Sequence, residues 1–501
     1  MPHYGTVQRV EALILGINKG YPPRYIRPQE LHDASNVFAV PGVLRSRPGY
    51  ASQGISKLDD LIQHARNFTL YSGLNLLTLC TAGGSALGDI WRFLGTKYAA
   101  GTLTIANGAL YVTGGGTAWL TNADYGDYLE FTDGAAVAQL LRVRGAITNG
   151  IIELSAAYTG GNATAVSYKL HQGNRNISQI YTTGTVTATK GSNAIVFAGS
   201  DVGAFLEACD WIYVGGTKKR YQIATVASPN ATLTENYSAT NSDEPVGAGK
   251  TFIAFMRPQT NKLFPFTSEI MTDLVLFFNK ANPNLSWDGD ATHYCEVLAP
   301  IIERSASFTN GTTAVVITGE NLTAFINAGD YVRARVVDGQ GALYMVDSVA
   351  FGAGDTTITL ATNYNGATAA KVAEIIRYTS RSPAGRFGSN FYNYLFVSGS
   401  QVYRTDYGNF TKPENFLSEN EGDRASFIDH AEQADTITAQ CIWNDALYVF
   451  GKRGISYLRF LGGPGLVSRN YIPGVGSVLN AVVPVRDGIV FISDIGIMRV
   501  S

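Results

Sequence analysis

One pattern occurs three times along the 501-residue chain, and it constrains the fold more than any other feature. In each copy, a glycine that closes a short strand is followed 19 positions later by an aspartate. The three pairs are Gly108 and Asp127, Gly191 and Asp210, and Gly311 and Asp330. A constant spacing in three copies indicates repeated units of one architecture. We place these units at residues 99–171, 182–255 and 303–378, and name them modules 1, 2 and 3.

Each module is predicted to be a small antiparallel β unit. Its opening segment alternates polar and apolar residues before a glycine turn, as in TLTIANG, TVTATKG and SASFTNG. A period of two between glycine turns is typical of half-buried strands. The repeated aspartate begins the next apolar strand, and we expect its side chain to bond its own backbone two residues on. A calcium ligand is the alternative interpretation, but no further oxygen donors recur around the three aspartates.

A second pattern lies between and around the modules. Apolar runs are joined by Gly, Asn or Asp turns, as in NYLFVSGSQVYRTDYGNF, DALYVFGKRGISYLRFL and DGIVFISDIGIMRV. Each run predicts a β-hairpin, and a series of such hairpins is typical of the blades of a β-propeller. The predicted fold is therefore all-β, a β-propeller-like scaffold that carries three inserted modules. The scaffold would comprise residues 1–98, 256–302 and 379–501.

Composition agrees with this fold class and argues against some functions. Glycine is frequent, with 54 residues, and there are 27 Tyr and 24 Phe, as expected for a turn-rich β protein. Only 16% of the residues are charged, and 38 Lys and Arg are balanced by 40 Asp and Glu. Phosphate binding needs clustered cations, so this balance argues against a polybasic nucleic-acid binder. It does not exclude a protein that surrounds DNA.

The cysteines and the first residues indicate synthesis in a reducing cytoplasm. Cys80, Cys209, Cys295 and Cys441 stand far apart without a CxxC pair, so we expect four buried thiols and no zinc site. The first twenty residues lack the charged and apolar regions of a signal peptide. No window approaches the apolar length of a membrane helix, so a soluble protein is expected.

The motifs that could carry chemistry have simpler interpretations. Residues 247–251, GAGKT, resemble the end of a phosphate-binding loop, but Glu244 stands where that motif needs glycine, and TFIAF predicts a strand. Asp288 and Asp290 could act as an acid and a base, although Asp-Gly-Asp is far more often a hairpin turn. The six histidines lack metal-binding spacings. We therefore predict no catalytic, cofactor-binding or metal-binding residues and no enzyme activity.

Two further sets of residues have a structural and a functional interpretation. Three large aromatic residues within the modules are expected in the core rather than on ligand platforms. These are Trp119, Trp211 and Phe325. Lys218, Lys219 and Arg220 form a tight basic run at the tip of a predicted hairpin. A solvated turn is the first interpretation of this run, and contact with an acidic neighbour is the alternative.

Both ends of the chain carry stretches that resemble one family. Near the N-terminus, RPQEL leads into DASNVFAVPGVLRSRPG, an Asn-containing turn followed by Pro-Gly and Arg-x-Arg-Pro-Gly. Towards the C-terminus, TITAQCIWNDALYVFG, GISY, PGVGSV, DGIVFIS and GI follow in that order. These stretches are similar to the tail nozzle and tail-hub (tail tubular) structural proteins of short-tailed bacteriophages. The modules resemble, in style only, the small β domains that decorate virion tail proteins.

The resemblance implies a propeller protomer in a homo-oligomeric ring, typically six-fold, below the portal and adaptor of the virion tail. Such a ring lines the channel through which DNA is ejected, and its low charge density suits a wall that DNA passes without binding. Other tail proteins would be partners, without a membrane span. The candidate interface residues are Arg45, Arg47, Lys218, Lys219 and Arg220.

Other interpretations stay open. A glycan-binding tail protein or adhesin could act through the modules, because repeated copies multiply weak affinities for a host surface glycan. A propeller glycosidase would need paired catalytic carboxylates. Relatives continue through further blades beyond the position of Ser501, which leaves three arrangements: a chain that continues, a neighbouring chain that completes the ring, or an open partial propeller. We expect a chain that continues.

Overall fold

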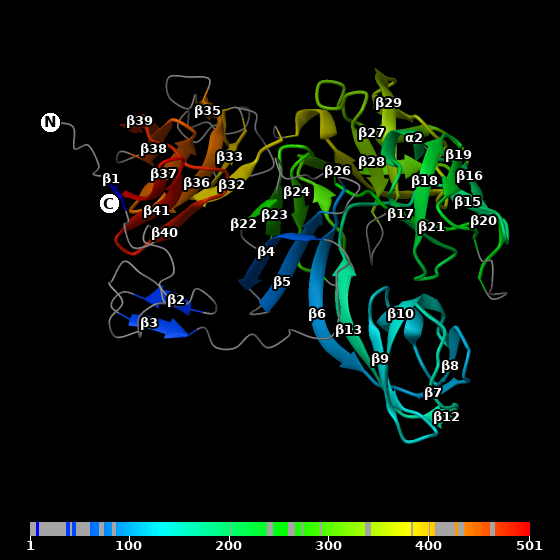
Figure 1. Cartoon of the computed structure of the whole chain (residues 1–501). Coiled ribbons are helices and arrows are strands. Elements are labelled where there is room, and N and C mark those ends of the chain that lie inside the picture. The colour runs from blue at the N-terminus through cyan, green and yellow to red at the C-terminus, as the bar shows by residue number, and fades with distance from the viewer. Residues whose placement is uncertain are drawn as a thin grey trace, which may run out of the picture. The chain divides into compact units, whose positions relative to one another are not determined.

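The computed structural model describes most of the chain as antiparallel β-sheets (Figure 1). The described residues are 7–9, 37–40, 43–46, 61–69, 75–82, 87–200, 202–237, 244–258, 266–271, 274–290, 293–335, 342–381, 384–399, 401–405, 426–428, 435–460 and 466–500. Their α-helices have only four residues each, α1 (Trp119–Asn122) and α2 (Val202–Phe205). The predicted all-β class is therefore confirmed. Contacts divide the chain into two units, residues 54–384 and residues 1–53 with 385–501.

Two four-stranded arrays of the first unit lie outside the modules. Their orders are β4-β5-β6-β13 and β22-β23-β24-β25. The strands are β4 (Leu61–Thr69), β5 (Asn75–Ala82), β6 (Ile90–Tyr98), β13 (Tyr168–Asn176), β22 (Thr267–Met271), β23 (Leu274–Phe278), β24 (Leu285–Trp287) and β25 (Glu296–Val297). The arrays share one core, which includes Cys80, Phe277 and Trp287. A 2.7 Å hydrogen bond between His64 Nε2 and Ser268 Oγ joins β4 to β22.

Module 1 continues directly from the first array. The nine-residue strands β6 and β13 pair along their length, and β13 also pairs with β9 of the module (Figure 1). The module strands are β7 (Thr102–Ile105), β8 (Tyr111–Gly115), β9 (Tyr128–Thr132), β10 (Ala138–Thr148), β11 (Ile151–Leu154) and β12 (Ala163–Val166). They enclose a core of their own around Trp119, Leu129 and Tyr158.

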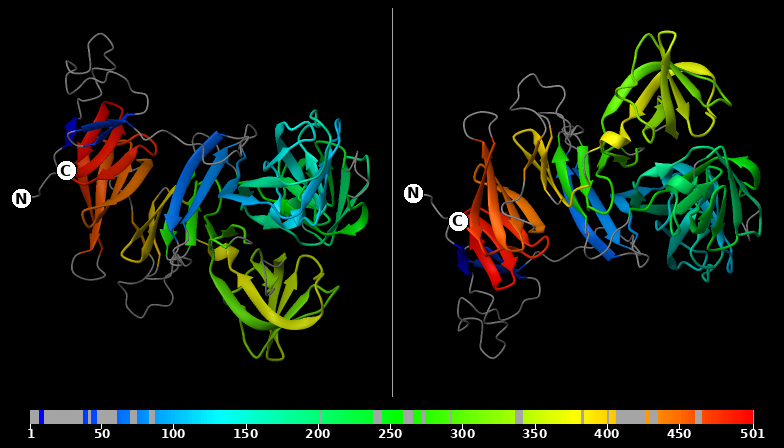
Figure 2. Two further views of the ribbon diagram at one scale, coloured as in Figure 1. Left: turned by 90° about the horizontal axis from the view of Figure 1, so that it is seen from below. Right: turned by 90° about the horizontal axis from the view of Figure 1, so that it is seen from above.

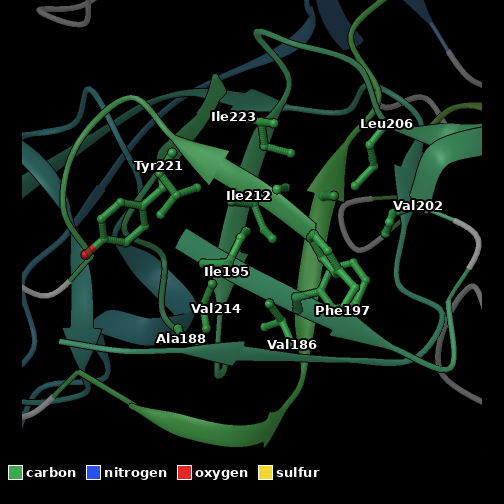
Figure 3. Close-up of a cluster of buried hydrophobic side chains, with 14 of the residues drawn as sticks. Val186, Ala188, Ile195, Phe197, Val202, Leu206, Ile212, Val214, Tyr221 and Ile223 are labelled. Carbon is green, nitrogen blue, oxygen red and sulfur yellow. The ribbon is translucent and has the colours of Figure 1, made fainter. Parts of the chain in front are cut away.

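Module 2 also has its own core, shown in Figure 3. Its strands are β15 (Thr185–Ala188), β16 (Ala194–Ala198), β17 (Trp211–Val214), β18 (Tyr221–Ala227), β19 (Asn230–Leu233), β20 (Gly247–Lys250) and β21 (Phe252–Phe255), and β14 (Ile180–Tyr181), just before the module, joins their sheet. Strand order is β14-β21-β17-β18-β19-β16-β15-β20. The alternating side chains of β15 and β16, Val186, Ala188, Ile195 and Phe197, all point into this core, as period-two alternation requires.

Module 3 is a closed six-stranded barrel, the green-to-yellow barrel of Figure 2. Its order is β26-β27-β30-β29-β28-β31. The strands are β26 (Ile301–Phe308), β27 (Ala314–Thr318), β28 (Tyr331–Ala334), β29 (Leu343–Gly352), β30 (Asp355–Leu360) and β31 (Ala369–Ile376), followed by a 3₁₀ turn at Tyr378–Ser380. Closure leaves the barrel without an open sheet edge.

The repeated aspartates form the same contacts in all three modules. One carboxylate oxygen accepts the backbone N–H three residues earlier at 2.8–2.9 Å, from Asp124, Glu207 or Asn327. The other accepts, at 2.8 Å, a backbone N–H 46, 47 or 49 residues later, from Gly173, Arg257 or Thr379. The expected bond two residues on is therefore wrong. Each carboxylate instead fastens the start of a strand to the segment that leaves the module, and we call this arrangement the aspartate clasp.

The glycine at the other end of the 19-residue spacing is also held in the same way in each copy. Its N–H donates to the carbonyl of a buried tyrosine, at 2.7, 2.9 and 2.8 Å. The pairs are Gly108 with Tyr158, Gly191 with Tyr237, and Gly311 with Tyr364. The three glycines have φ between 75° and 82°, a left-handed conformation that glycine adopts without steric cost. Both ends of the sequence pattern thus mark a long-range contact.

The second unit contains three four-stranded antiparallel sheets and one separate hairpin. The sheet orders are β32-β33-β34-β35, β36-β37-β38-β39 and β1-β42-β41-β40, and the hairpin is β2-β3. The strands are β1 (Val7–Arg9), β2 (Val37–Val40), β3 (Val43–Ser46), β32 (Phe387–Phe391), β33 (Tyr394–Ser398), β34 (Val402–Arg404), β35 (Ser426–Ile428), β36 (Ile437–Trp443), β37 (Ala446–Gly451), β38 (Gly454–Phe460), β39 (Leu466–Pro473), β40 (Val482–Val485), β41 (Gly488–Ser493) and β42 (Gly496–Val500).

Consecutive sheets of this unit pack face to face. One core joins the first sheet to the second and includes Phe396 and Leu447, and another joins the second to the third and includes Phe450 and Phe491. Gln440 Nε2 on β36 also donates to the carbonyl oxygen of Phe396 at 3.1 Å. The third sheet is completed by the N-terminal strand β1, which pairs antiparallel with β42.

Candidate functional site

The basic run lies at the junction of modules 1 and 2, between β17 and β18. Lys219 is 3% exposed and Arg220 is 5% exposed, so the solvated-turn interpretation is wrong for both residues. Strand β10 of module 1 covers the run, and the N–H of Lys218 donates to the carbonyl of Ala146 at 2.7 Å. A Cβ at Gly145 would lie 2.5 Å from the carbonyl oxygen of Lys218, so this close approach requires glycine.

Lys219 is paired with two carboxylates from different modules. Its Nζ lies 2.9 Å from Glu153 Oε2 on β11 and 2.7 Å from Glu244 Oε1, and both carboxylates are buried. Arg144 donates to the other oxygen of Glu153 at 3.2 Å, and Tyr221 donates to the other oxygen of Glu244. Burial lowers the pKa of Lys219, but the two carboxylates raise it above its usual value. The ion pairs therefore fasten modules 1 and 2 together.

Arg220 is held by aromatic rings. Its guanidinium carbon lies 4.9 Å from the ring of Trp91, 5.0 Å from Tyr125 and 4.9 Å from Trp211. Its Nε and Nη2 have no hydrogen-bond partner among the residues that the structure describes. Ring faces attract a cation most strongly when water is excluded, so this arrangement suits a structural cation. The acidic and aromatic residues that contact residues 219–220 belong to this chain. A role of residues 219–220 in contacts between chains stays a prediction.

Arg45 and Arg47 are the other candidate interface residues. Arg45 belongs to β3, where the structure describes the backbone pairing but not the side chain, and it pairs with Phe38 of β2. Arg47 lies outside the described residues. The interface role of Arg45 and Arg47 also stays a prediction.

The three aromatic residues expected in the core have different environments. Trp119 is fully buried and its Nε1 donates to the hydroxyl of Tyr168 at 2.9 Å, which confirms the prediction. Trp211 is half-buried, with Arg220 on its ring. Phe325 is 50% exposed, so the core prediction is wrong for this residue. Its backbone carbonyl accepts Arg377 Nε at 2.7 Å, a contact that holds the turn while the ring lies in solvent.

The Asp288-Gly-Asp290 pair forms a turn, as the sequence predicted. It follows β24, the N–H of Asp290 donates to Asp288 Oδ1 at 3.0 Å, and Gly289 has φ of 82°. The second oxygen of Asp288 is 2.5 Å from His293 Nδ1, on a partly exposed surface. Its hydrogen bonds therefore assign Asp288 a role in the local structure of this loop.

The contact with Asp288 predicts a raised pKa for His293 and a contribution to stability that depends on pH. The hydrogen bond from His293 to this carboxylate raises the pKa of His293 above its ordinary value of 6.5, although burial acts in the opposite direction. The pairing should therefore stabilise the folded state fully below pH 6.5, and this contribution should disappear as the pH rises through the pKa in the folded state. An NMR titration of the imidazole should give a pKa above 6.5, and Asp288→Asn should lower it. An unchanged pKa in the variant would contradict the pairing.

The structure also describes the GAGK sequence and the four cysteines. Residues Gly247–Lys250 form β20 and Phe252–Phe255 form β21, so the predicted strand after the GAGK sequence is confirmed. All four thiols are free, and three of them are buried. Cys209 is half-buried and has a left-handed backbone conformation in the turn before the clasp residue Asp210. In the described part of the chain, no cluster of three His, Cys, Asp or Glu residues could hold a metal ion.

A small cavity lies between β25, the start of module 2 and module 3. Its volume is about 30 Å³, and Cys295, Glu296, Tyr331 and Arg333 are among the lining residues. A single water needs about 10–15 Å³, so the cavity has room for water but not for a sugar or a nucleotide. Glu296 and Arg333 form an ion pair on its wall.

Comparisons with known proteins do not place the chain in a family. No family model and no curated protein matches the sequence. Among solved structures, the chain is similar to the endosialidase of phage phi92, with 11% identity over 87% of this chain and a TM-score of 0.15. It spans 63% of that protein's chain. This TM-score is too low to indicate a shared fold or function. Within the described residues, no helix is long and apolar enough to span a membrane.

Proposed function

We propose that the chain is a structural protein of a bacteriophage virion tail, a nozzle or hub protomer whose propeller-like scaffold lines the DNA ejection channel. The observation that carries the proposal is a succession of four-stranded antiparallel arrays, namely four separate sheets and the β4-β5-β6-β13 end of the ten-stranded sheet that continues into module 1. A four-stranded antiparallel sheet is the unit of a propeller blade. Successive arrays share a core in both units of the chain, as neighbouring blades do.

The pairing of β1 with β42 gives the last sheet of the second unit its fourth strand. The register joins Val7 to Val500 and Arg9 to Met498, so the last sheet takes a strand from the opposite end of the chain. A strand supplied in this way covers a sheet edge and gives the sheet four strands, the number in a propeller blade.

The stretches that resemble tail proteins coincide with this scaffold. TITAQCIWNDALYVFG covers β36 and β37, and DGIVFIS covers β41. The modules are insertions between scaffold strands, as the decoration of a tail protein would be. We assign no catalytic step to the chain.

A channel wall should bind DNA weakly, and this gives a testable prediction. Lys and Arg are outnumbered by Asp and Glu, 38 to 40, and several cations at the module junctions, such as Lys219 and Arg257, are paired with buried carboxylates. These paired cations are not available for phosphate contacts. Fluorescence anisotropy with labelled duplex DNA should give a Kd weaker than about 10⁻⁴ M at physiological salt, with little salt dependence. Tight, strongly salt-dependent binding would argue against a passive wall.

The decisive experiment is electron microscopy of virions produced by the genome that encodes this chain, with mass spectrometry to identify the chain in the particles. We expect a stoichiometric ring between the portal and the tail tip, with the scaffold towards the channel. Absence of the chain from the particles would overturn the proposal. Its location only in peripheral fibres would overturn the nozzle assignment and favour glycan binding through the modules.

A further inference from the structure

Tyr392 is a large aromatic residue at an unusual backbone position. It lies in the turn between β32 and β33 with φ of +54°, and its side chain is 54% exposed. Bulky residues rarely adopt a left-handed conformation, which Asn, Asp and Gly tolerate better. The turn between β36 and β37 also has two residues with positive φ, but there they are Asn444 and Asp445, with φ of 46° and 59°. Tyr392 thus occupies a position where a small polar residue would suit the turn better.

Contacts from two adjacent hairpins fix the orientation of the Tyr392 ring. Its hydroxyl donates to Asp445 Oδ1 at 2.8 Å. Its ring meets Phe391 at 4.8 Å and Phe460 at 5.5 Å, in both cases nearly perpendicular to its neighbour. Behind these rings, Tyr394 stacks on Phe460 at 5.4 Å. A ring that is already oriented loses little conformational entropy when a ligand binds.

The surroundings of the exposed ring are polar. Asn393, Asn444 and Asp445 are all exposed at the two turns. The second carboxylate oxygen of Asp445 makes no hydrogen bond to the described residues. A protein partner would need roughly 800 Å² of surface with an apolar centre, whereas the exposed ring here adjoins Asn393, Asn444 and Asp445. An aromatic face flanked by hydrogen-bonding groups instead suits a ligand with one apolar face and a rim of hydroxyls.

We propose that Tyr392 and Asp445 form a binding site for a neutral sugar residue of a glycan. The C–H face of a pyranose packs on the exposed Tyr392 ring, and a sugar hydroxyl donates to the second oxygen of Asp445. Two opposite charges act on Tyr392, and the Asp445 carboxylate acts more strongly than the Arg459 cation, so the site disfavours acidic sugars. The site lies outside the modules, so it is independent of the glycan-binding alternative based on them. It does not depend on the nozzle assignment.

The test measures binding of defined probes to the full chain by saturation-transfer NMR and calorimetry. The neutral probes are cellohexaose, maltohexaose and chitohexaose, and the acidic probe is hexagalacturonate. We expect millimolar binding of at least one neutral probe and weaker binding of the acidic probe. No binding of any neutral probe, or tightest binding of the acidic probe, would overturn the proposal.

Substitutions distinguish a binding role of Tyr392 from a structural one. Tyr392→Asn should weaken probe binding at least tenfold while the melting temperature stays the same or rises, because Asn suits the left-handed turn. Tyr392→Phe should keep part of the affinity, since the ring remains but loses its anchor to Asp445. The matched control is Phe351→Asn, which removes another exposed aromatic ring and should leave binding unchanged. The sugar assignment would be overturned if the Tyr392→Asn variant bound the probes as tightly as the wild type. A change in the sedimentation coefficient of this variant would also overturn it.

Discussion

Replacing Asp330 by Asn should lower the free energy of unfolding by about 3 kcal/mol, because hydrogen bonds to a buried charged group contribute about 1.5–3 kcal/mol. Asp330 is fully buried. One of its oxygens accepts the N–H of Asn327, and the other accepts the N–H and the hydroxyl of Thr379. An amide keeps only one acceptor oxygen, and its NH₂ group would face a backbone donor. Chemical denaturation of the full chain would measure the loss.

The aspartate clasp also predicts where the damage appears. Hydrogen exchange should accelerate in β28 and β31, which the clasp fastens, more than in module 1. Asp347→Asn is the matched control, because this aspartate in the same module is exposed, and it should change stability by less than about 0.5 kcal/mol. Equal effects of the two substitutions would contradict the clasp.

Replacing Lys219 by Met should destabilise the junction of modules 1 and 2 by about 3–5 kcal/mol, the usual effect of removing one member of a buried ion pair. The methionine side chain has a similar volume, so the loss should reflect charge rather than packing. It would leave Glu153 and Glu244 without the cation that lies 2.9 and 2.7 Å from them. Thermal unfolding and denaturant titration would measure the effect.

The neighbouring lysine supplies the matched control. Lys218 is only half-buried, with Nζ 5.5 Å from the Tyr213 ring, and this kind of contact contributes about 0.5–1 kcal/mol. Lys218→Met should therefore cost no more than about 1 kcal/mol. In the Lys219→Met background, Glu244→Gln should restore part of the lost stability, because it removes an uncompensated buried charge. Similar effects of the two lysine substitutions would show that the ion pairs do not stabilise the junction.

The spacing of Gly311 and Asp330 shows how far the sequence reaches. Glycine and aspartate both have special backbone roles in turns. Their constant separation in three copies therefore revealed equivalent positions in the three modules. The identity of the partner did not follow, because Thr379 lies 49 residues beyond Asp330 and no local rule connects them. The expected turn bond was a local solution, and the structure instead uses a long-range one.

The basic run shows a second limit. Adjacent cations on a hairpin are usually solvated, so the sequence favoured an exposed turn for Lys219 and Arg220. Their burial depends on module 1, whose strand β10 approaches through Gly145 and whose β11 carries Glu153. Phe325 shows the converse, since its apolar ring is exposed while its backbone carbonyl is used by Arg377.

By itself, the sequence determined the all-β class, the equivalence of the repeated Gly and Asp positions, the strand after the GAGK sequence and the turn at Asp288. Each of these depends on alternation or on the backbone preferences of a few neighbouring residues. Only the tertiary structure decided which charges are buried, which residues close the modules, and that β1 completes the last sheet. These features join residues far apart in the chain, and their energy comes from excluding water around groups that local sequence does not bring together.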